Sequence, residues 1–272
     1  MCSSDLRSVS AGMRTAVNRA WMAWCLAPLG EFAESGAHAK EALRLAEASQ
    51  HDLTLAMTYS AVARPALMQG DFPTAIGWLT RSLEICRRSN FAPLSLLVSS
   101  DLGQAYALSG RVPEAVALLE EASAQSSALR LMPTHAWNVT ALAESYLLAG
   151  RWADAVRELA RGLGMAQTHR QRWLEAEGLR IQSAVRLSAA SPDLQGARAD
   201  AERAARIADE LGLRPLLGRC HLALGQVARQ AGDTRAHAHL EQAVGLFDEM
   251  DMRYWLEQAE AERRMLGDSS KG

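Results

Sequence analysis

The chain repeats one short phrase four times at a spacing of forty residues: Gly30-Glu31-Phe32-Ala33, Gly70-Asp71-Phe72-Pro73, Gly110-Arg111-Val112-Pro113 and Gly150-Arg151-Trp152-Ala153. Each phrase begins with glycine and carries an aromatic or branched residue two places later. Self-similarity at a period of 20–50 residues is typical of stacked repeat arrays, in which each unit buries its apolar face on its neighbours. The forty-residue period therefore predicts a repeat fold that needs no single central core.

The same phase can be followed through most of the chain. Further turns are expected near Pro192 and at Gly232-Asp233, so the array holds about six units. Gly103 and Ala143 occupy equivalent places in the apolar stretches before two turns, where we expect helices to approach closely. Small residues also lie twelve places after each turn glycine and at two later positions: Ala42, Ser82, Ala122, Gly162, Ala204 and Ala243.

Between the turns the pattern predicts paired helices. Leu102 and Tyr106 lie four residues apart and share one helical face, and β-branched runs typical of strands are missing. The prolines at 93, 133 and 215 fall where the first turn of a helix tolerates the missing N–H donor. The predicted first helices are 12–28, 52–69, 93–109, 133–149, 172–189 and 214–231. The predicted second helices are 31–49, 71–88, 111–129, 151–168, 193–211 and 233–250, and a capping helix at 252–266 closes the array.

The short loops leave no linker, so we expect one repeat domain over residues 7–272. Its units are expected at about 12–50, 51–90, 91–130, 131–170, 171–212 and 213–251. Residues 1–6, Met1-Cys2-Ser3-Ser4-Asp5-Leu6, match what a common sequencing adapter would encode. We interpret this hexapeptide as a non-native leader, in which case the natural protein extends upstream.

Composition and charge indicate a soluble helical array. Hydrophobic residues make up 49% of the chain and charged residues 22%, with a formal net charge of −2. That balance gives no general attraction to nucleic acid or to an anionic membrane, and no stretch is apolar enough to span a bilayer. Four cysteines without paired spacing favour a reduced, cytoplasmic setting: Cys2, Cys25, Cys86 and Cys220.

Two of the forty-residue phrases resemble the tetratricopeptide repeat (TPR): Leu102-Gly103…Tyr106…Gly110…Ala115 and Leu142…Tyr146…Gly150…Ala155. Leu224-Gly225-Gln226…Gly232…Ala236 is a weaker copy. That repeat is usually about 34 residues long, so the longer period implies one more helical turn per unit. The segment from Leu211 to Glu257 resembles the tails of bacterial multidomain signalling proteins. Such proteins carry a class III nucleotide cyclase and an AAA-type ATPase ahead of the array.

No common catalytic or cofactor motif is present. The sequence lacks a phosphate-binding loop, a zinc helix, a nucleophile elbow and a calcium loop. His237 and His239 point away from each other on a helix, and the adjacent Cys220 and His221 do not face each other. Three acidic pairs are read as solvated helix faces: Glu120-Glu121, Glu175/Glu177 and Glu257/Glu260. We therefore expect no enzyme, no cofactor and no metal site.

The TPR resemblance implies a concave groove lined by the first helix of each unit. Positions ten and six residues before each turn glycine would point into it, among them Ala20 and Trp24 and, where the spacing changes, Gln182, Arg186 and Leu222. With Trp137 as an aromatic anchor, the predicted binding residues are Ser60, Arg64, Ser100, Gln104, Trp137, Thr140, Glu144 and Gln226. An unused solvated face would show the same pattern, and Trp137 could equally pack between units. Trp78, Trp152 and Trp173 are expected in the core.

Helices 93–109 and 133–149 contain one charge each, Asp101 and Glu144. Such helices should be covered on both sides, which places units three and four in the middle of the array.

The resemblance implies a non-catalytic interaction or scaffold module with a protein or peptide partner in the groove. It would be the regulatory C-terminal part of a larger bacterial signalling protein. Two alternatives stay open. One is a small-molecule or peptide sensor of an ATP-dependent transcription activator, and the other is the repeat tail of a nucleotide cyclase. Upstream ATPase or cyclase domains of the same polypeptide are further expected partners.

Overall fold

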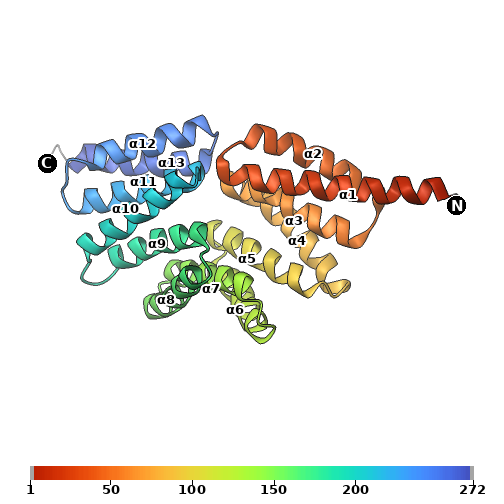
Figure 1. Ribbon diagram of the computed structural model, residues 1–272. Coiled ribbons are helices and arrows are strands. Elements are labelled where there is room, and N and C mark those ends of the chain that lie inside the picture. Colours follow the sequence, from red (N-terminus) through yellow and green to blue (C-terminus); the bar gives the residue numbers. More distant parts are fainter. Residues whose placement is uncertain (1–2, 270–272) are drawn as a thin grey trace.

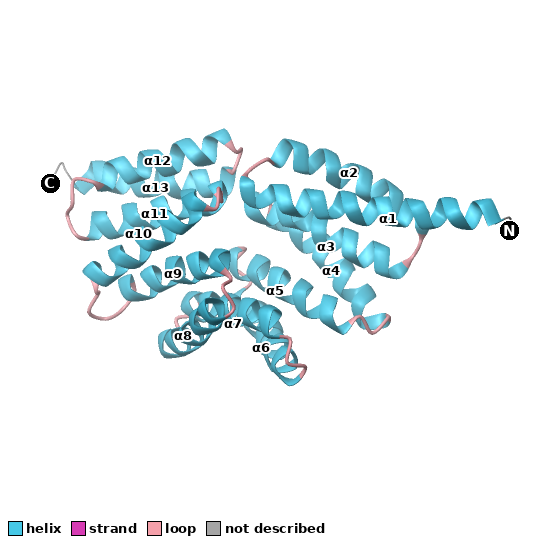
Figure 2. Cartoon of the chain, viewed as in Figure 1, coloured by secondary structure: helices cyan, strands magenta, loops and turns pink. Residues whose placement is uncertain are grey.

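The computed structural model describes residues 3–269, and every regular element in that range is a helix (Figure 2). The elements are α1 (Ser3–Leu26), η1 (Ala27–Leu29), α2 (Phe32–Ser49), α3 (Asp52–Gln69), α4 (Phe72–Arg88), α5 (Ala92–Leu108), α6 (Val112–Ala128), α7 (Met132–Leu148), α8 (Trp152–Thr168), α9 (Arg172–Leu187), α10 (Leu194–Glu210), α11 (Arg214–Gln230), α12 (Ala236–Glu249) and α13 (Arg253–Ser269). The predicted all-α solenoid is confirmed.

Two helix starts differ from the prediction. Helix α1 begins at Ser3 rather than near residue 12, so residues 3–6 of the expected leader are helical, while residues 1–2 lie outside the described part. Helix α12 begins at Ala236 because Asp233 forms a tight turn, in which its Oδ1 accepts the Arg235 backbone N–H at 2.9 Å. The aspartate thus delays the helix by three residues relative to the predicted start at 233.

The repeated glycines end the first helix of each unit. Gly30, Gly70, Gly110 and Gly150 have φ between 71° and 88°, which is the left-handed region that glycine tolerates best. The next backbone N–H then reaches back to a carbonyl five residues earlier, as in Arg111 N–H to Tyr106 O at 2.8 Å. This Schellman arrangement satisfies carbonyls that the helix leaves free.

A second series of left-handed residues ends the second helices without glycine. Gln50, Asn90, Arg130 and Arg170 have φ between 49° and 57° and also lie forty residues apart. A non-glycine residue in this region is uncommon because its Cβ crowds the backbone. The turn at Arg130 nevertheless closes in the same local way, with the Leu131 N–H donating to Ser126 O at 3.0 Å.

Apolar contacts are spread along the array in several clusters rather than one core. Gly103 lies where α5 meets α6: a Cβ built on it would sit only 2.4 Å from Leu119 Cγ. Ala143 is fully buried at the equivalent place in α7. The close approach predicted for Gly103 is present.

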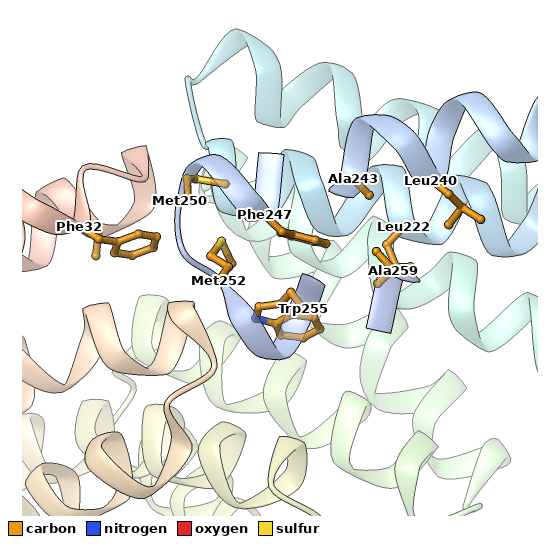
Figure 3. Close-up of a cluster of buried hydrophobic side chains, with 10 residues drawn as sticks. Phe32, Leu222, Leu240, Ala243, Phe247, Met250, Met252, Trp255 and Ala259 are labelled. Carbon is orange, nitrogen blue, oxygen red and sulfur yellow. The ribbon is translucent and has the colours of Figure 1, made fainter. Parts of the chain in front are cut away.

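The array curls round until its last helices return to its first (Figure 1). Phe32 at the start of α2 joins one buried cluster with Phe247, Met250, Met252 and Trp255 from α12, α13 and the turn between them. Figure 3 shows Phe32 reaching toward Met250 and Phe247 from the opposite side of this contact. A linear array does not require such a contact between its ends.

Three hydrogen bonds tie the returning segment to the ends of α3 and α5. Trp255 Nε1 donates to Met68 O at 3.1 Å, and Tyr254 OH donates to Leu108 O at 3.5 Å. Gln69 Nε2 donates to the carbonyl of Met250 at 3.4 Å. These side chains cap helix C-termini, whose last carbonyls would otherwise lack partners.

Near the closure, a turn glycine is needed both for its left-handed backbone and for the lack of a side chain against the neighbouring helix. A Cβ on Gly70 would lie 2.5 Å from Tyr254 Cβ, whereas a Cβ on Gly110 would meet nothing within 4 Å. Both residues have nearly the same φ, 88° and 86°. We predict that Gly110→Ala costs about 1 kcal/mol from backbone strain alone, and that Gly70→Ala costs ~1–3 kcal/mol more from overpacking at the closure.

Urea unfolding of the two variants beside the parent chain measures this difference. Equal losses of unfolding free energy would mean that the end-to-end contact does not form in solution.

Candidate functional site

A cavity of about 710 Å³ lies inside the curled array. Its walls come from first helices α1, α3, α5, α7, α9 and α11, from the turns beside them and from α13. The apolar part of the wall includes Leu67, Met68, Leu108, Ile181, Leu213 and Leu216. Four tryptophans line it as well: Trp24, Trp137, Trp173 and Trp255. A cavity of this size and composition matches the usual range for ligand sites, roughly 300–1,000 Å³.

Arg64 of α3 is the centre of one side of this cavity. Its NH1 donates to Asp101 Oδ1 of α5 at 3.0 Å, and both side chains are more than nine-tenths buried. Its guanidinium carbon lies 4.7, 4.6 and 5.8 Å from the ring centroids of Trp24, Trp137 and Trp173. Aromatic faces attract a guanidinium electrostatically, more strongly where water is excluded. The cluster therefore joins five residues, one from each of units one to five: Trp24, Arg64, Asp101, Trp137 and Trp173.

Burial removes the Asp101 carboxylate from water, which disfavours its charged form. Burial raises the pKa of Asp101 to about 6, although the charge and the hydrogen bond of Arg64 act in the opposite direction. Within the described residues, Asp101 Oδ2 and Arg64 Nε have no hydrogen-bond partner. The pair is thus held by the surrounding tryptophans and by its own attraction, without a wider hydrogen-bond network.

A second charged cluster lies on the other side of the cavity. Glu144 Oε1 accepts from Arg180 at 2.5 Å and from Arg219 at 3.4 Å, and Glu177 Oε1 accepts from the same two residues at 2.8 and 3.0 Å. Burial opposes ionisation of Glu177, but the two arginines outweigh it and hold the pKa of Glu177 at about 2. The ring face of Trp255 lies 4.5 Å from the Arg219 guanidinium carbon. The expectation that Glu177 lies on a solvated face is wrong, because the curl brings α9 and α11 together.

The predicted binding residues divide into two groups. Arg64, Gln104, Trp137, Thr140 and Glu144 line the cavity. Of these, Gln104 has the loosest contact, since its Nε2 lies 3.5 Å from Glu144 Oε2.

The other three predicted residues do not line it. Ser60 is buried, and the Ser100 hydroxyl donates to Leu96 O within its own helix at 3.1 Å. Gln226 instead donates to Glu262 of α13 at 3.0 Å. The prediction chose residues ten and six positions before each turn glycine, as in an open groove. The residues that line the cavity also depend on how the array closes on itself.

Of the three tryptophans expected in the core, only Trp152 contradicts the expectation. Trp173 packs against the buried cluster that contains Trp137 and Leu174, as expected, but it also lines the cavity, with its ring centroid 5.0 Å from that of Trp137. Trp152 is 44% exposed, with its Nε1 donating to Val185 O at 3.0 Å. Trp78 is half-buried and packs against the buried cluster that contains Leu79 and Leu83, in line with the expectation, and its ring centroid lies 5.1 Å from that of Tyr59.

Sequence reasoning missed several cavity residues, chiefly Glu177, Arg219 and Trp255. Glu177 follows Trp137 by one period of forty residues, so the repeat phase of Trp137 would have found it. Arg219 and Trp255 carry no such signal, because the spacing changes after the fourth unit and the closure has no sequence motif.

Other candidate chemistry is limited in the part of the chain that the structure describes. No cluster of three or more metal-binding side chains is found within residues 3–269. His239 is half-buried and stacks on His221 with ring centroids 5.6 Å apart, so the prediction that it is solvated is wrong. Among the described helices, none has the length and apolarity needed to cross a membrane.

No family model matches the chain, and no curated protein matches it. Its structure is similar to BtubC from P. vanneervenii, with 22% identity and a TM-score of 0.56 over 79% of this chain and 90% of that one. It is also similar to the apo form of RapI, with 13% identity and a TM-score of 0.58 over 92% and 99%.

A third similar structure is a Signal Transduction ATPase with Numerous Domains (STAND) that has a tetratricopeptide repeat sensor, from Pyrococcus horikoshii. The identity is 17% and the TM-score 0.55, and the match covers 93% of this chain but only 38% of that protein. At these identities the likenesses show the fold, and the chain is a TPR-like α-solenoid.

The raised pKa of Asp101 makes a prediction about stability and pH. Because the folded chain binds a proton at Asp101 more tightly than the unfolded chain does, this group stabilises the fold below about pH 4. That contribution is lost as the pH rises through about 6. The Asp101→Asn variant lacks this titration.

We therefore expect the unfolding free energy of the parent, relative to Asp101→Asn, to fall by about 2 kcal/mol between pH 4 and pH 6.5. Urea unfolding at several pH values measures it, and a difference that stays constant with pH would contradict the burial of this pair.

Proposed function

We propose that this chain is a non-catalytic recognition module that binds an extended segment of a partner protein in the central cavity. The observation that carries the proposal is the cavity itself, with four tryptophans and the side chains of Gln104 and Glu144 on its wall. Rigid aromatic side chains supply large contact areas at low entropic cost and dominate binding hot spots. The fold supports the same class of function, because repeat solenoids offer extended concave surfaces for binding.

Gln104 and Glu144 are suited to hold a peptide backbone. The 3.5 Å separation between Gln104 Nε2 and Glu144 Oε2 is too long for a strong hydrogen bond, so the Gln104 amide and this one oxygen of Glu144 keep capacity for a ligand, while Glu144 Oε1 is held by Arg180 and Arg219. An amide side chain offers both donors and an acceptor, which matches the N–H and C=O groups of an extended chain.

A small-molecule sensor is the second candidate, and the closure of the array favours it. Trp255 both lines the cavity and bonds to Met68 O across the end-to-end contact. A ligand enclosed in this way would be surrounded on most sides, as drug-sized ligands usually are. The repeat region of the similar STAND protein is described as a sensor.

One serine and one histidine lie close enough to resemble a catalytic nucleophile and its base, and their surroundings support a non-catalytic role. Ser126 Oγ lies 2.9 Å from His135 Nδ1, but Ser126 is fully buried and its hydroxyl also donates to Ser123 O at 3.1 Å. A nucleophile has to reach its substrate, and this hydroxyl is covered. We read the pair as a packing contact between α6 and α7.

We further propose that the module regulates a larger bacterial signalling protein in the cytoplasm, with ATPase or nucleotide cyclase domains elsewhere in that polypeptide. The match to 38% of the STAND protein supports this setting, since a similar array there is one part of a longer chain.

The test fills the cavity without touching the charged clusters. Ala141 lines the cavity and is 5% exposed, so Ala141→Phe should occupy ligand space. Ala160→Phe on the exposed side of α8 is the matched control. Glu144 and Trp137 are left intact because both belong to buried networks whose loss would destabilise the fold.

We expect affinity capture from lysate of the source organism, followed by denaturation and mass spectrometry, to release one ligand from the parent and from Ala160→Phe. Ala141→Phe should lose it while its circular dichroism stays helical. A released peptide supports the first candidate and a small molecule the second. Equal recovery from folded Ala141→Phe would place the binding site outside the cavity.

A further inference from the structure

Two histidines from neighbouring helices of the last unit face each other. His221 of α11 and His239 of α12 bring their Nδ1 atoms to 3.4 Å. The ring centroids lie 5.6 Å apart, so the two Nδ1 atoms lie between the rings and point at each other. Both side chains are half-buried. Helical spacing separates His239 from His237 on its own helix, and its partner is instead eighteen residues earlier in the chain.

Glycines bring the two helices close enough for this contact. Gly218 and Gly225 lie on the α11 face that meets α12, and His221 lies between them in the sequence. A Cβ on Gly218 would lie 2.6 Å from Phe247 Cε1, and a Cβ on Gly225 would lie 2.5 Å from Leu240 Cδ2. Phe247 and Leu240 are fully buried. Because close packing fixes the backbone on both sides of His221, the two imidazoles are held at this separation.

A hydrogen bond accounts poorly for this arrangement. One Nδ1 would have to carry a proton and the other accept it, and 3.4 Å exceeds the usual length of about 2.7–3.2 Å for a bond donated by N–H. The separation instead matches two ligands of one metal ion. Two imidazole nitrogens at about 2.0–2.1 Å from a tetrahedral zinc ion lie about 3.3–3.4 Å apart.

The charges around the pair favour a cation. Both nearby arginines are held by Asp233, Arg198 at 3.1 Å and Arg235 at 2.7 Å. Three carboxylates and two guanidinium groups therefore leave an excess of one negative charge beside the imidazoles. The five side chains that act electrostatically on the pair are Arg198, Glu202, Asp209, Asp233 and Arg235.

We propose that His221 and His239 bind one divalent transition-metal ion of the zinc class through their Nδ1 atoms. Imidazole nitrogen suits such metals, whereas Mg²⁺ and Ca²⁺ prefer oxygen ligands. In the part of the chain that the structure describes, no third metal-binding side chain completes a cluster with the pair. The other coordination positions are therefore open to water or to a further ligand.

A metal at this position has a structural consequence. It joins α11 to α12, and α12 carries Phe247, which packs in the same cluster as Phe32 at the end-to-end contact. Bound metal therefore stabilises the helix pair that closes the array. Neither histidine lines the central cavity, so this site is independent of the proposed recognition function.

The probe is Zn²⁺ alone, offered to the full chain by equilibrium dialysis. A Cys2→Ser, Cys25→Ser background removes two competing thiols, and burial raises the pKa of Cys86 to about 11 and that of Cys220 to about 12, which disfavours their thiolates. We expect one zinc ion per chain and no competition from Mg²⁺. His221→Gln and His239→Gln should each weaken binding by at least about tenfold, since loss of a group behind a metal ligand already costs roughly 10–100-fold.

His237→Gln is the matched control, because His237 lies on the same helix but is exposed and paired with Glu241 at 3.0 Å. It should bind zinc like the parent, and so should Ala141→Phe, whose substitution fills the cavity. Zinc should raise the midpoint of thermal unfolding of the parent and of His237→Gln, but not that of His239→Gln. Circular dichroism shows whether each variant is folded.

A measurement on the unsubstituted chain avoids any dependence on variants. With Cu²⁺ in place of Zn²⁺, electron paramagnetic resonance should show coupling to two imidazole nitrogens. Coupling to only one imidazole, absence of stoichiometric zinc binding, equal zinc binding by folded His239→Gln, or loss of binding in His237→Gln would each overturn the proposal.

Discussion

The ion pair between Arg64 and Asp101 is the constraint on which the rest of the structure depends. A buried charge is tolerated only when its surroundings compensate for lost hydration, and here the compensation comes from Asp101 and from the faces of three tryptophans. Together with Arg64, those residues belong to five successive units. The units cannot change their relative angles without uncovering the guanidinium, so the local requirement of one side chain sets the curvature of the array.

Curvature in turn produces the closure and the cavity. In an open solenoid each unit contacts only its neighbours, but in this chain Trp255 and Tyr254 reach the ends of α3 and α5. The contact buries Phe32 against α12 and α13 (Figure 3). It also encloses space that a straight array would leave open. The second charged cluster lies on the cavity wall made by the later units. Its two carboxylates, Glu144 and Glu177, are matched in charge by Arg180 and Arg219.

Much of the fold could be predicted from the sequence, because the sequence features that determine the helices and turns act within a single unit. Turn glycines such as Gly110 and the apolar period act within one unit, and they predicted most helix bounds to within a few residues. The left-handed turn at Arg130 could not be predicted, because no glycine marks it. Five of the eight predicted site residues line the cavity for the same local reason. Glu177 and Trp255 lie there only because distant units meet, and that depends on curvature rather than on sequence spacing.

The central claim is that Arg64 holds five units together, and hydrogen exchange of Arg64→Met tests it most directly. Local opening shows which segments share a stabilising interaction. Faster exchange is predicted together in α1, α3, α5, α7 and α9, the helices that supply Trp24, Arg64, Asp101, Trp137 and Trp173. Exchange in the middle of α12 should stay close to that of the parent. Faster exchange confined to α3 and α5 would contradict the account, because it would reduce the cluster to an ion pair between neighbouring units.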